Sequence, residues 1–125
     1  GKAGSGKSTL MKFLHQHERT RALLDRWVNG VQLILANFFF YALGRSEQKS
    51  QSGLLRSLLH QVLRDDPTTI KVGLPNMWQE AFYNDGNDSD NLSMPSVAEI
   101  RVALKDFCAS CHSGKKLCLL IDGID

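Results

Sequence analysis

Apolar and polar positions alternate along the chain in blocks that predict helices and strands in turn. Residues 8–27 carry apolar side chains at intervals that suit one helix, and Asn29 with Gly30 ends the pattern. Residues 31–41 (VQLILANFFFY) are almost continuously apolar, with Asn37 as the exception. Such a run predicts a strand that is buried on both faces, as in parallel sheets. We expect the apolar side of the first helix to pack on that sheet.

The middle of the chain is predicted to be helical. Residues 50–63 place leucine and valine side chains on one helical face, and Pro67 lies just beyond the end of this pattern. Residues 75–83 predict a second, shorter helix. Residues 84–91 (NDGNDSDN) have the composition of a loop. These helices would cover the sheet or extend from it.

The last third of the chain predicts one more helix and one more strand. Ser96 and Glu99 have the spacing of a capping box, and apolar residues then follow at three- and four-residue steps. Residues 117–121 (LCLLI) form a short apolar run, typical of a buried strand. Strands that alternate with helices indicate the α/β class, with a parallel sheet flanked by helices.

The first nine residues, GKAGSGKST, fit the phosphate-loop pattern G-x-x-x-x-G-K-[ST], with Gly1, Gly6, Lys7 and Ser8 on its fixed positions. Glycines let the backbone turn and approach an anion closely. The helix that starts there adds a partial positive charge. The alternative is a glycine-rich turn before a helix, although at average residue usage about one chain of this length in two hundred would match by chance.

Each residue of this loop has an expected task at a bound nucleoside triphosphate. Backbone N–H groups would come from Gly4, Ser5 and Gly6. Lys7 would reach the β- and γ-phosphates, and the Ser8 hydroxyl would ligate Mg²⁺. Thr9 would contact the α-phosphate.

A second chemical signal follows the final apolar run, which continues as Asp122-Gly123-Ile124-Asp125. A carboxylate at the carboxyl end of a buried strand is what a phosphate-loop site needs to hold Mg²⁺, usually through water. The alternative is an aspartate that opens a turn, because D-G is a common turn pair. The upstream phosphate loop favours Asp122 as the metal-holding residue. Asp125 is the weaker candidate, for the metal or as a catalytic group that orients water.

Both ends of the chain predict that it is a piece of a larger domain. A phosphate loop connects a buried strand to a helix, and no residues precede Gly1 to form that strand. The apolar run before Asp125 has no closing element after it. We therefore expect a truncated phosphate-loop domain whose first strand and later strands are missing.

The two end motifs together resemble those of a NACHT domain, which belongs to the STAND class of P-loop NTPases. The stretch GKAGSGKST is similar to its Walker A motif at 1–9, and LCLLIDGID to its Walker B motif at 117–125. Between them, FFF at 38–40 and SGLLRSLLHQVL at 52–63 resemble the fungal, nephrocystin-3-like N-terminal branch. The resemblance spans residues 1–125, as a partial NACHT domain.

This resemblance implies a cytoplasmic signalling switch that binds ATP or GTP with Mg²⁺ and oligomerises on nucleotide exchange. Repeat and effector domains would lie outside this segment, and the role would be in incompatibility or innate-defence signalling. The two strands would be neighbours at one edge of a five-stranded parallel sheet. The family pattern continues with an acidic residue after Asp125, so these residues alone are not expected to hydrolyse nucleotide. Turnover by the parent protein is left open.

Other nucleotide-binding classes fit the sequence less well. An ABC-type transporter ATPase needs an LSGGQ-like segment before the second motif and a D-E pair within it, whereas residues 108–116 and Gly123 stand there. The phosphate-loop motif is the only feature of the sequence that supports a small-metabolite kinase. An interaction module, with nucleotide as a structural ligand and assembly as output, is compatible with the family resemblance.

The three cysteines allow further interpretations. Because their number is odd, they do not indicate a framework of paired disulfides, which favours a reducing compartment. Cys108, Cys111 and His112 fit the C-x-x-C-H haem-attachment pattern, but we expect Cys108 to be buried on an amphipathic helix. Zinc held by these three residues with Cys118 is disfavoured, because Cys118 lies in a strand that should be buried.

Composition adds little to this picture. The chain has 125 residues, 42% of them hydrophobic and 22% charged, which suits one small globular domain. The net charge of +2 gives no reason to expect nucleic acid or a membrane surface as partner. The longest apolar run, 31–43, is shorter than the roughly 20 residues of a membrane-spanning helix. The acidic loop 85–90 lacks the register of a calcium-binding loop.

Overall fold

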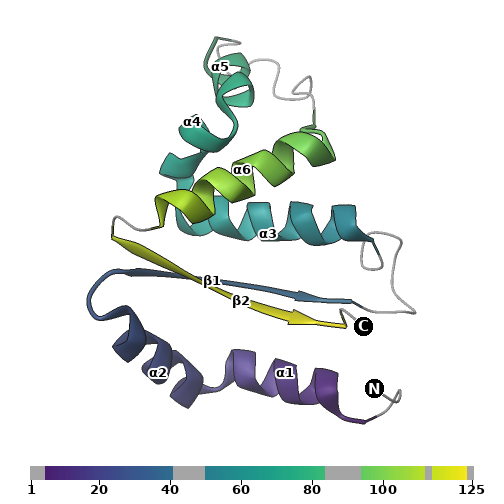
Figure 1. Cartoon of the computed structure of the whole chain (residues 1–125), viewed down its shortest axis with the longest axis vertical. Helices are drawn as coiled ribbons and strands as arrows, with labels where there is room; N and C mark the ends of the chain where they lie inside the picture. Colours follow the sequence, from purple (N-terminus) through teal and green to yellow (C-terminus); the bar gives the residue numbers. More distant parts are fainter. Residues whose placement is uncertain (1–4, 41–49, 84–93, 112–113, 124–125) are drawn as a thin grey trace.

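The computed structural model describes residues 5–40, 50–83, 94–111 and 114–123. Within these residues, two parallel strands form a middle layer between two layers of helices (Figure 1). One helical layer contains α1 (Lys7–Gln16) and α2 (Glu18–Val28). The other contains α3 (Gln51–Asp65) and α6 (Val97–Ser110), beyond which lie the 3₁₀ turn η2 (Pro67–Thr69), α4 (Ile70–Gly73) and α5 (Pro75–Tyr83). The predicted α/β class, with helices on both sides of a parallel sheet, is confirmed.

The two strands are neighbours, as expected. Strand β1 (Gln32–Phe39) pairs in parallel with β2 (Lys115–Asp122), in a continuous register that runs from Gln32 opposite Lys115 to Phe39 opposite Asp122. Strand β2 begins two residues earlier than predicted and includes Asp122. Because parallel strands end on the same side, the carboxyl end of β1 lies beside Asp122.

The prediction of one helix over 8–27 is wrong. The backbone of His17 is extended, with ψ 129°, and separates α1 from α2. The Nδ1 atom of His17 accepts a hydrogen bond from the Arg19 N–H at 3.0 Å and so caps the start of α2. Asn29, with φ 53°, ends α2 at the place that the sequence predicted. The break allows α1 and α2 to follow the sheet as two short segments.

Strand β1 has buried residues on one face only, so the prediction of burial on both faces is wrong. Ile34, Ala36 and Phe38 are buried, and alternate residues are half-buried or exposed. The buried face joins a core formed with α3 and α6, whose other buried members are Leu58, Leu59, Val62, Leu74, Ile100, Ala103 and Phe107. The hydrophobic core therefore lies on the α3 and α6 side of the sheet.

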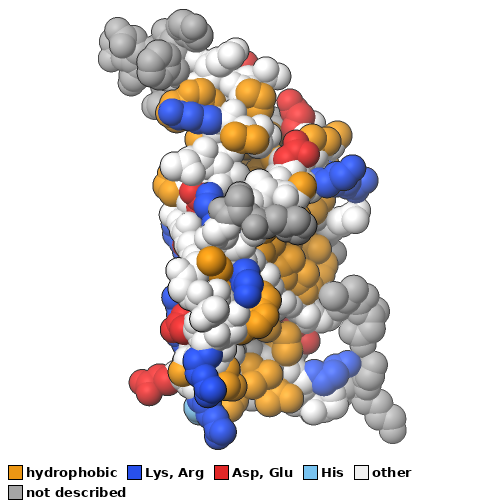
Figure 2. Space-filling view, turned by 60° about the vertical axis from the view of Figure 1, so that its left-hand side comes forward, with side chains coloured by type: hydrophobic (Ala, Val, Ile, Leu, Met, Phe, Trp, Pro, Cys, Tyr) orange, Lys and Arg blue, Asp and Glu red, His pale blue; other side chains and the backbone are white. Residues whose placement is uncertain are grey.

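The α1 and α2 side is packed less tightly. No residue of α1 is buried, and Val28 is the buried residue of α2. In the space-filling view, hydrophobic side chains reach the surface near the lower end of the molecule, where α1 and α2 lie, among lysine and arginine side chains (Figure 2). The apolar side chains of these helices that remain 37% to 57% exposed are Leu10, Phe13, Leu14, Leu23 and Trp27. The expected packing of the first helix on the sheet is therefore only partial.

Polar contacts fix the ends of the core helices. The capping box at α6 is confirmed, because Ser96 Oγ accepts from the Glu99 N–H and a Glu99 carboxylate oxygen accepts from the Ser96 N–H at 2.8 Å. At the end of α3, the buried Asp66 carboxylate accepts from the Thr68 and Thr69 hydroxyls, each at 2.6 Å, and forms an ion pair with Lys115. Lys115 is the first residue of β2, so this pair joins α3 to the sheet.

The Asp66 carboxyl group titrates well below its ordinary range. Burial alone would raise its pKa, but the hydrogen bonds from Lys115, Thr68 and Thr69 more than offset that effect and lower the pKa to about 2. The group is therefore stabilised in its charged form.

The predicted helices at 50–63 and 75–83 are confirmed as α3 and α5. The predicted acidic loop at 84–91 lies outside the described residues. Within the part of the chain that the structure describes, no helix has the length and apolarity that a bilayer crossing requires.

Candidate functional site

The start of α1 has the features of an anion-binding helix terminus. Gly6 precedes it in the left-handed conformation, with φ 79° and ψ 2°, which favours glycine. The first backbone bond of the helix joins the Leu10 N–H to the Gly6 C=O at 2.9 Å, so the amides of Ser8 and Thr9 have no acceptor within the helix. No cap side chain and no acidic residue of the first turn balances the partial positive charge there. This terminus therefore suits a negatively charged ligand.

Asp122 lies at the carboxyl end of β2 with an unsatisfied carboxylate oxygen. The residue is 8% exposed, and its Oδ2 atom is buried with no hydrogen-bond partner among the described residues. Its backbone C=O accepts from the Phe40 N–H at 3.1 Å, which continues the pairing of the two strands. A buried carboxylate oxygen without a partner is costly, and a cation or a bound water would satisfy it.

The residue after Asp122 must be glycine in this fold. Gly123 has φ 84°, and a Cβ added to it would lie 2.9 Å from the Cβ of Phe40. The chain therefore turns sharply where β2 ends. The two interpretations of the D-G pair do not exclude each other, because the glycine makes the turn while Asp122 remains in the strand.

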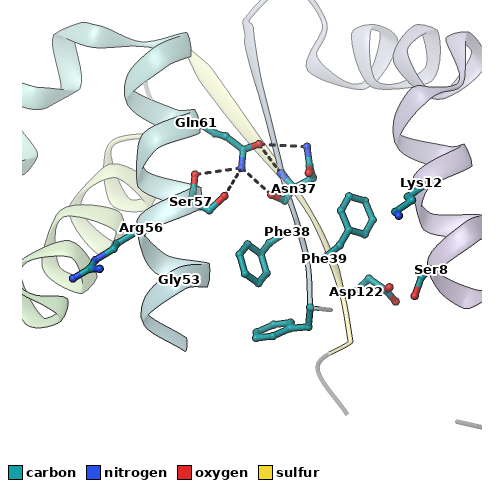
Figure 3. A pocket seen from close by; sticks show the side chains of 11 residues that line it. Ser8, Lys12, Asn37, Phe38, Phe39, Gly53, Arg56, Ser57, Gln61 and Asp122 are labelled. Atoms are coloured by element: carbon teal, nitrogen blue, oxygen red, sulfur yellow. Dashed lines mark hydrogen bonds between the residues drawn. The ribbon is translucent and has the colours of Figure 1, made fainter. Parts of the chain in front are cut away.

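Both features meet at an open cavity of about 730 Å³. Ser8 and Lys12, one turn apart on α1, line it from one side, and Asp122 and Phe39 line it from the strand ends. The Lys12 Nζ atom lies 5.9 Å from the centre of the Phe39 ring. Figure 3 shows the Asp122 carboxylate beside the Ser8 hydroxyl. The cavity extends past the end of β1 to α3, where its lining residues are Gly53, Arg56, Ser57 and Gln61.

The structure brings the two predicted metal-holding residues, Ser8 and Asp122, to one cavity. The other described residues of the predicted phosphate loop are solvent-exposed at the start of α1, namely Ser5, Gly6, Lys7 and Thr9. Gly1, Gly4 and Asp125 lie outside the described residues. The predicted roles of these loop residues and of Asp125 stay predictions.

A polar cluster beside this cavity was not predicted from the sequence. The side-chain amide of Gln61 on α3 bonds to both backbone groups of Asn37, and Asn37 contacts His15 of α1. The signal for Asn37 was present, since it interrupts an apolar strand. The signal for Gln61 was weaker, because a polar residue between Leu58 and Val62 looks like an ordinary exposed position of an amphipathic helix.

The cysteines form no site in the part of the chain that is described. Cys108 is exposed, so the expectation of a buried Cys108 is wrong, because the core-facing positions of α6 are Ala103 and Phe107 instead. Cys111 and Cys118 are half-buried, and burial raises the pKa of each thiol. No group of three or more potential metal ligands occurs among the described residues, and His112 lies outside them.

Comparison with known proteins identifies the family. Neither the curated proteins nor the solved structures contain a match to the chain. The family model described as nephrocystin 3, N-terminal, matches residues 1–125, which is the whole sequence. The chain therefore belongs to the nephrocystin 3 N-terminal family.

Proposed function

We propose that residues 1–125 are the nucleoside-triphosphate-binding part of a STAND switch, a partial NACHT domain of the P-loop NTPase type. One observation carries the proposal. The uncapped start of α1 and the unsatisfied Oδ2 of Asp122 meet at one cavity, with the Ser8 hydroxyl beside the carboxylate. A positive helix terminus opposite a buried carboxylate suits a phosphate chain with a bound cation.

The residues at this cavity fit Mg²⁺. The ion prefers oxygen ligands and retains several waters, so the Ser8 hydroxyl would bind it directly and Asp122 would bind it through water. When bound, Mg²⁺ neutralises charge on the β- and γ-phosphates. An unsatisfied carboxylate oxygen next to a hydroxyl supports this assignment.

The other loop residues would hold the phosphates. Backbone N–H groups of Gly4, Ser5 and Gly6 would face them, and Lys7 would contribute its charge. Thr9 would contact the α-phosphate. Gly1 would allow the loop to begin its turn. Asp125 would orient a water molecule or assist at the metal.

By family resemblance, the nucleotide is ATP or GTP, and the parent protein is a cytoplasmic switch in incompatibility or innate-defence signalling. It would self-associate on nucleotide exchange, with repeat and effector domains outside this segment. A structural observation supports a switch. The helix that would bind the phosphates contains no buried residue, so a ligand at its start would add much to its attachment.

Removal of the Lys7 charge tests the proposal. The Lys7→Ala variant of the intact protein should lose binding of fluorescent ATP and GTP analogues in the presence of Mg²⁺. Lys105→Ala is the matched control, since Lys105 is an exposed lysine of α6 and should leave affinity unchanged. Equal affinity of Lys7→Ala and the wild type would overturn the assignment.

Measurement of turnover separates an NTPase from an interaction module that holds nucleotide as a structural ligand. Sustained phosphate release by the intact protein would indicate an NTPase. Tight binding with negligible release would favour the structural ligand, and the weak packing of α1 agrees with that alternative as well.

A further inference from the structure

We infer that Gln61 and Asn37 are positioning residues that connect α3 to the phosphate-binding helix through strand β1. A chain of hydrogen bonds runs from α3 through β1 to α1, beside the cavity that Ser8 and Asp122 line. This inference rests on the proposed nucleotide site, because positioning matters for function only if that site binds a ligand.

The Gln61 amide is saturated by partners on α3 and β1, as Figure 3 shows. Its oxygen accepts from the Asn37 N–H at 3.0 Å and from Asn37 Nδ2 at 3.3 Å. Its nitrogen donates to the Asn37 C=O at 2.8 Å and to the backbone and hydroxyl oxygens of Ser57, at 3.2 and 3.1 Å. All donors and acceptors of the amide are therefore engaged, so its position on the strand is strongly determined.

The backbone fixes the direction of each further bond. The Gln61 oxygen must accept the strand N–H, and its nitrogen must donate to the strand C=O. Asn37 Nδ2 therefore donates to the Gln61 oxygen and directs its second N–H at His15. The His15 Nε2 atom lies 2.7 Å from Asn37 Nδ2 and must accept, which assigns the imidazole tautomer with Nε2 unprotonated.

His15 lies on the same face of α1 as the residues that line the cavity. Ser8, Lys12 and His15 are spaced by four and three residues, so they share one face of the helix. His15 lies two turns after Ser8, about 10 Å along the helix axis. A hydrogen bond at His15 therefore restricts the rotation and sliding of Ser8 relative to Asp122.

Among the described residues, apolar packing contributes little to holding α1 in place. None of its residues is buried, and its apolar side chains Leu10, Phe13 and Leu14 are more than one-third exposed. Dispersion and hydrophobic contacts with the sheet are correspondingly weak. The polar chain therefore contributes to the position of the helix, and an event that shifts α3 would act on the proposed phosphate site. By linkage, nucleotide would also change the equilibrium of α3.

A pair of matched variants tests the connection. Asn37→Ala removes the side chain that contacts His15 and leaves the backbone bonds to Gln61 possible. Gln32→Ala is the control, because Gln32 on the same strand also bonds to α3, with its Nε2 atom 3.0 Å from the Asp65 C=O, but at the far end of β1. We expect Asn37→Ala to weaken binding of a Mg²⁺–ATP or Mg²⁺–GTP analogue roughly fivefold or more, and Gln32→Ala to leave it unchanged.

Variants at His15 separate positioning from general stability. His15→Leu removes the acceptor and should weaken nucleotide binding as Asn37→Ala does, whereas His15→Gln offers an oxygen acceptor and should restore it. Nitrogen NMR of the wild-type imidazole should show Nε2 unprotonated. Equal loss of affinity in His15→Leu and His15→Gln would overturn the positioning role.

The outcomes also distinguish this inference from the proposed function. If Lys7→Ala abolishes binding while Asn37→Ala and His15→Leu bind as tightly as the wild type, the site stands and the positioning role is wrong. If the wild type binds no nucleotide, both are wrong. Hydrogen exchange without nucleotide tests the physical link alone: Asn37→Ala should raise exchange of the α1 amides, and Gln32→Ala should not. Equal exchange in the two variants would contradict the link.

Discussion

The two helical layers on either side of the sheet differ in how they are held. The α3 and α6 layer supplies most of the buried side chains of the core, including Val62, Ile100 and Phe107. The α1 and α2 layer contributes Val28 to the buried residues and leaves Phe13 and Trp27 at least half exposed. The same sheet therefore has one face packed as a core and one face covered by two helices that bury few of their residues.

This difference separates stability from the candidate chemistry. The layer that supplies most of the core contains none of the predicted phosphate or metal ligands. The layer with few buried residues carries the described part of the predicted phosphate loop at the start of α1, where Ser8 lines the same cavity as Asp122. Regions with few buried apolar contacts open at low free energy and are suited to ligand-dependent change. Substitutions on the two sides should therefore affect different properties.

Core truncation should give the largest difference between the layers. Phe107 is 2% exposed and packs with Ile34 and Val62, so Phe107→Ala should lower the free energy of unfolding by about 3–5 kcal/mol. Phe13→Ala, on the 56%-exposed side chain of α1, should cost about 1 kcal/mol or less. Urea denaturation followed by circular dichroism measures both. Similar losses for the two phenylalanines would contradict the contrast between the layers.

The turn after β2 should be the next most sensitive point. Gly123→Ala should destabilise the fold by about 2–3 kcal/mol, because the left-handed backbone strain is joined by a clash with Phe40. Gly30→Ala is the matched control: its φ of 86° is similar, but an added Cβ meets nothing within 4 Å, so only about 1 kcal/mol should be lost. Thermal unfolding compares the two. An equal shift in Tm would show that the contact with Phe40 is unimportant.

Acid should weaken the core layer through Asp66. Its pKa in the folded chain is about 2, below the ordinary 3.8, so its contribution to stability is present above about pH 4 and is lost as the pH falls through the folded value. The loss should amount to about 2 kcal/mol between pH 4 and pH 2. Urea midpoints across this range should fall, and Asp66→Asn should remove this part of the slope. An unchanged slope in Asp66→Asn would contradict the assignment.

Surface contacts should have the smallest effects on the free energy of unfolding. The contact on α6 should again contribute more than the contact on α2. Ser96→Ala removes the capping box of α6 and should cost about 1 kcal/mol. Arg21→Ala removes an exposed ion pair with Asp25 on α2, at 3.2 Å, and should cost only a few tenths of a kcal/mol. Denaturant midpoints of the two variants provide the comparison. A larger effect at Arg21 would mean that α2 is held more tightly than its burial indicates.

The sequence predicted the features that depend on local chemistry. The spacing of Ser96 and Glu99 located a helix start, and apolar runs located both strands, because these signals lie within a few residues of one another. It also placed Asp122 at the end of a strand. The adjacency of the strands came from family resemblance, since pairing across about 80 residues leaves no local trace.

Most of what the sequence did not predict depends on tertiary contacts. The break at His17 is a local exception, because the His17 imidazole accepts from the N–H of Arg19, two residues later, in a stretch whose periodicity suits a single helix. The Gln61 amide acquires its role only because α3 packs beside β1, within hydrogen-bond reach of the Asn37 backbone. The exposure of Cys108 follows from which face of α6 meets the sheet. None of these can be inferred from residue type and spacing alone.

The most direct test of the central claim is the effect of Mg²⁺ on nucleotide affinity in the wild type and in Asp122→Ala. The claim is that the start of α1 and Asp122 together hold a metal-bound triphosphate. Titration of the intact protein with a fluorescent ATP or GTP analogue should show tight binding that requires Mg²⁺, and Asp122→Ala should lose this dependence. Wild-type affinity that is indifferent to Mg²⁺ and unaltered by Asp122→Ala would contradict the account.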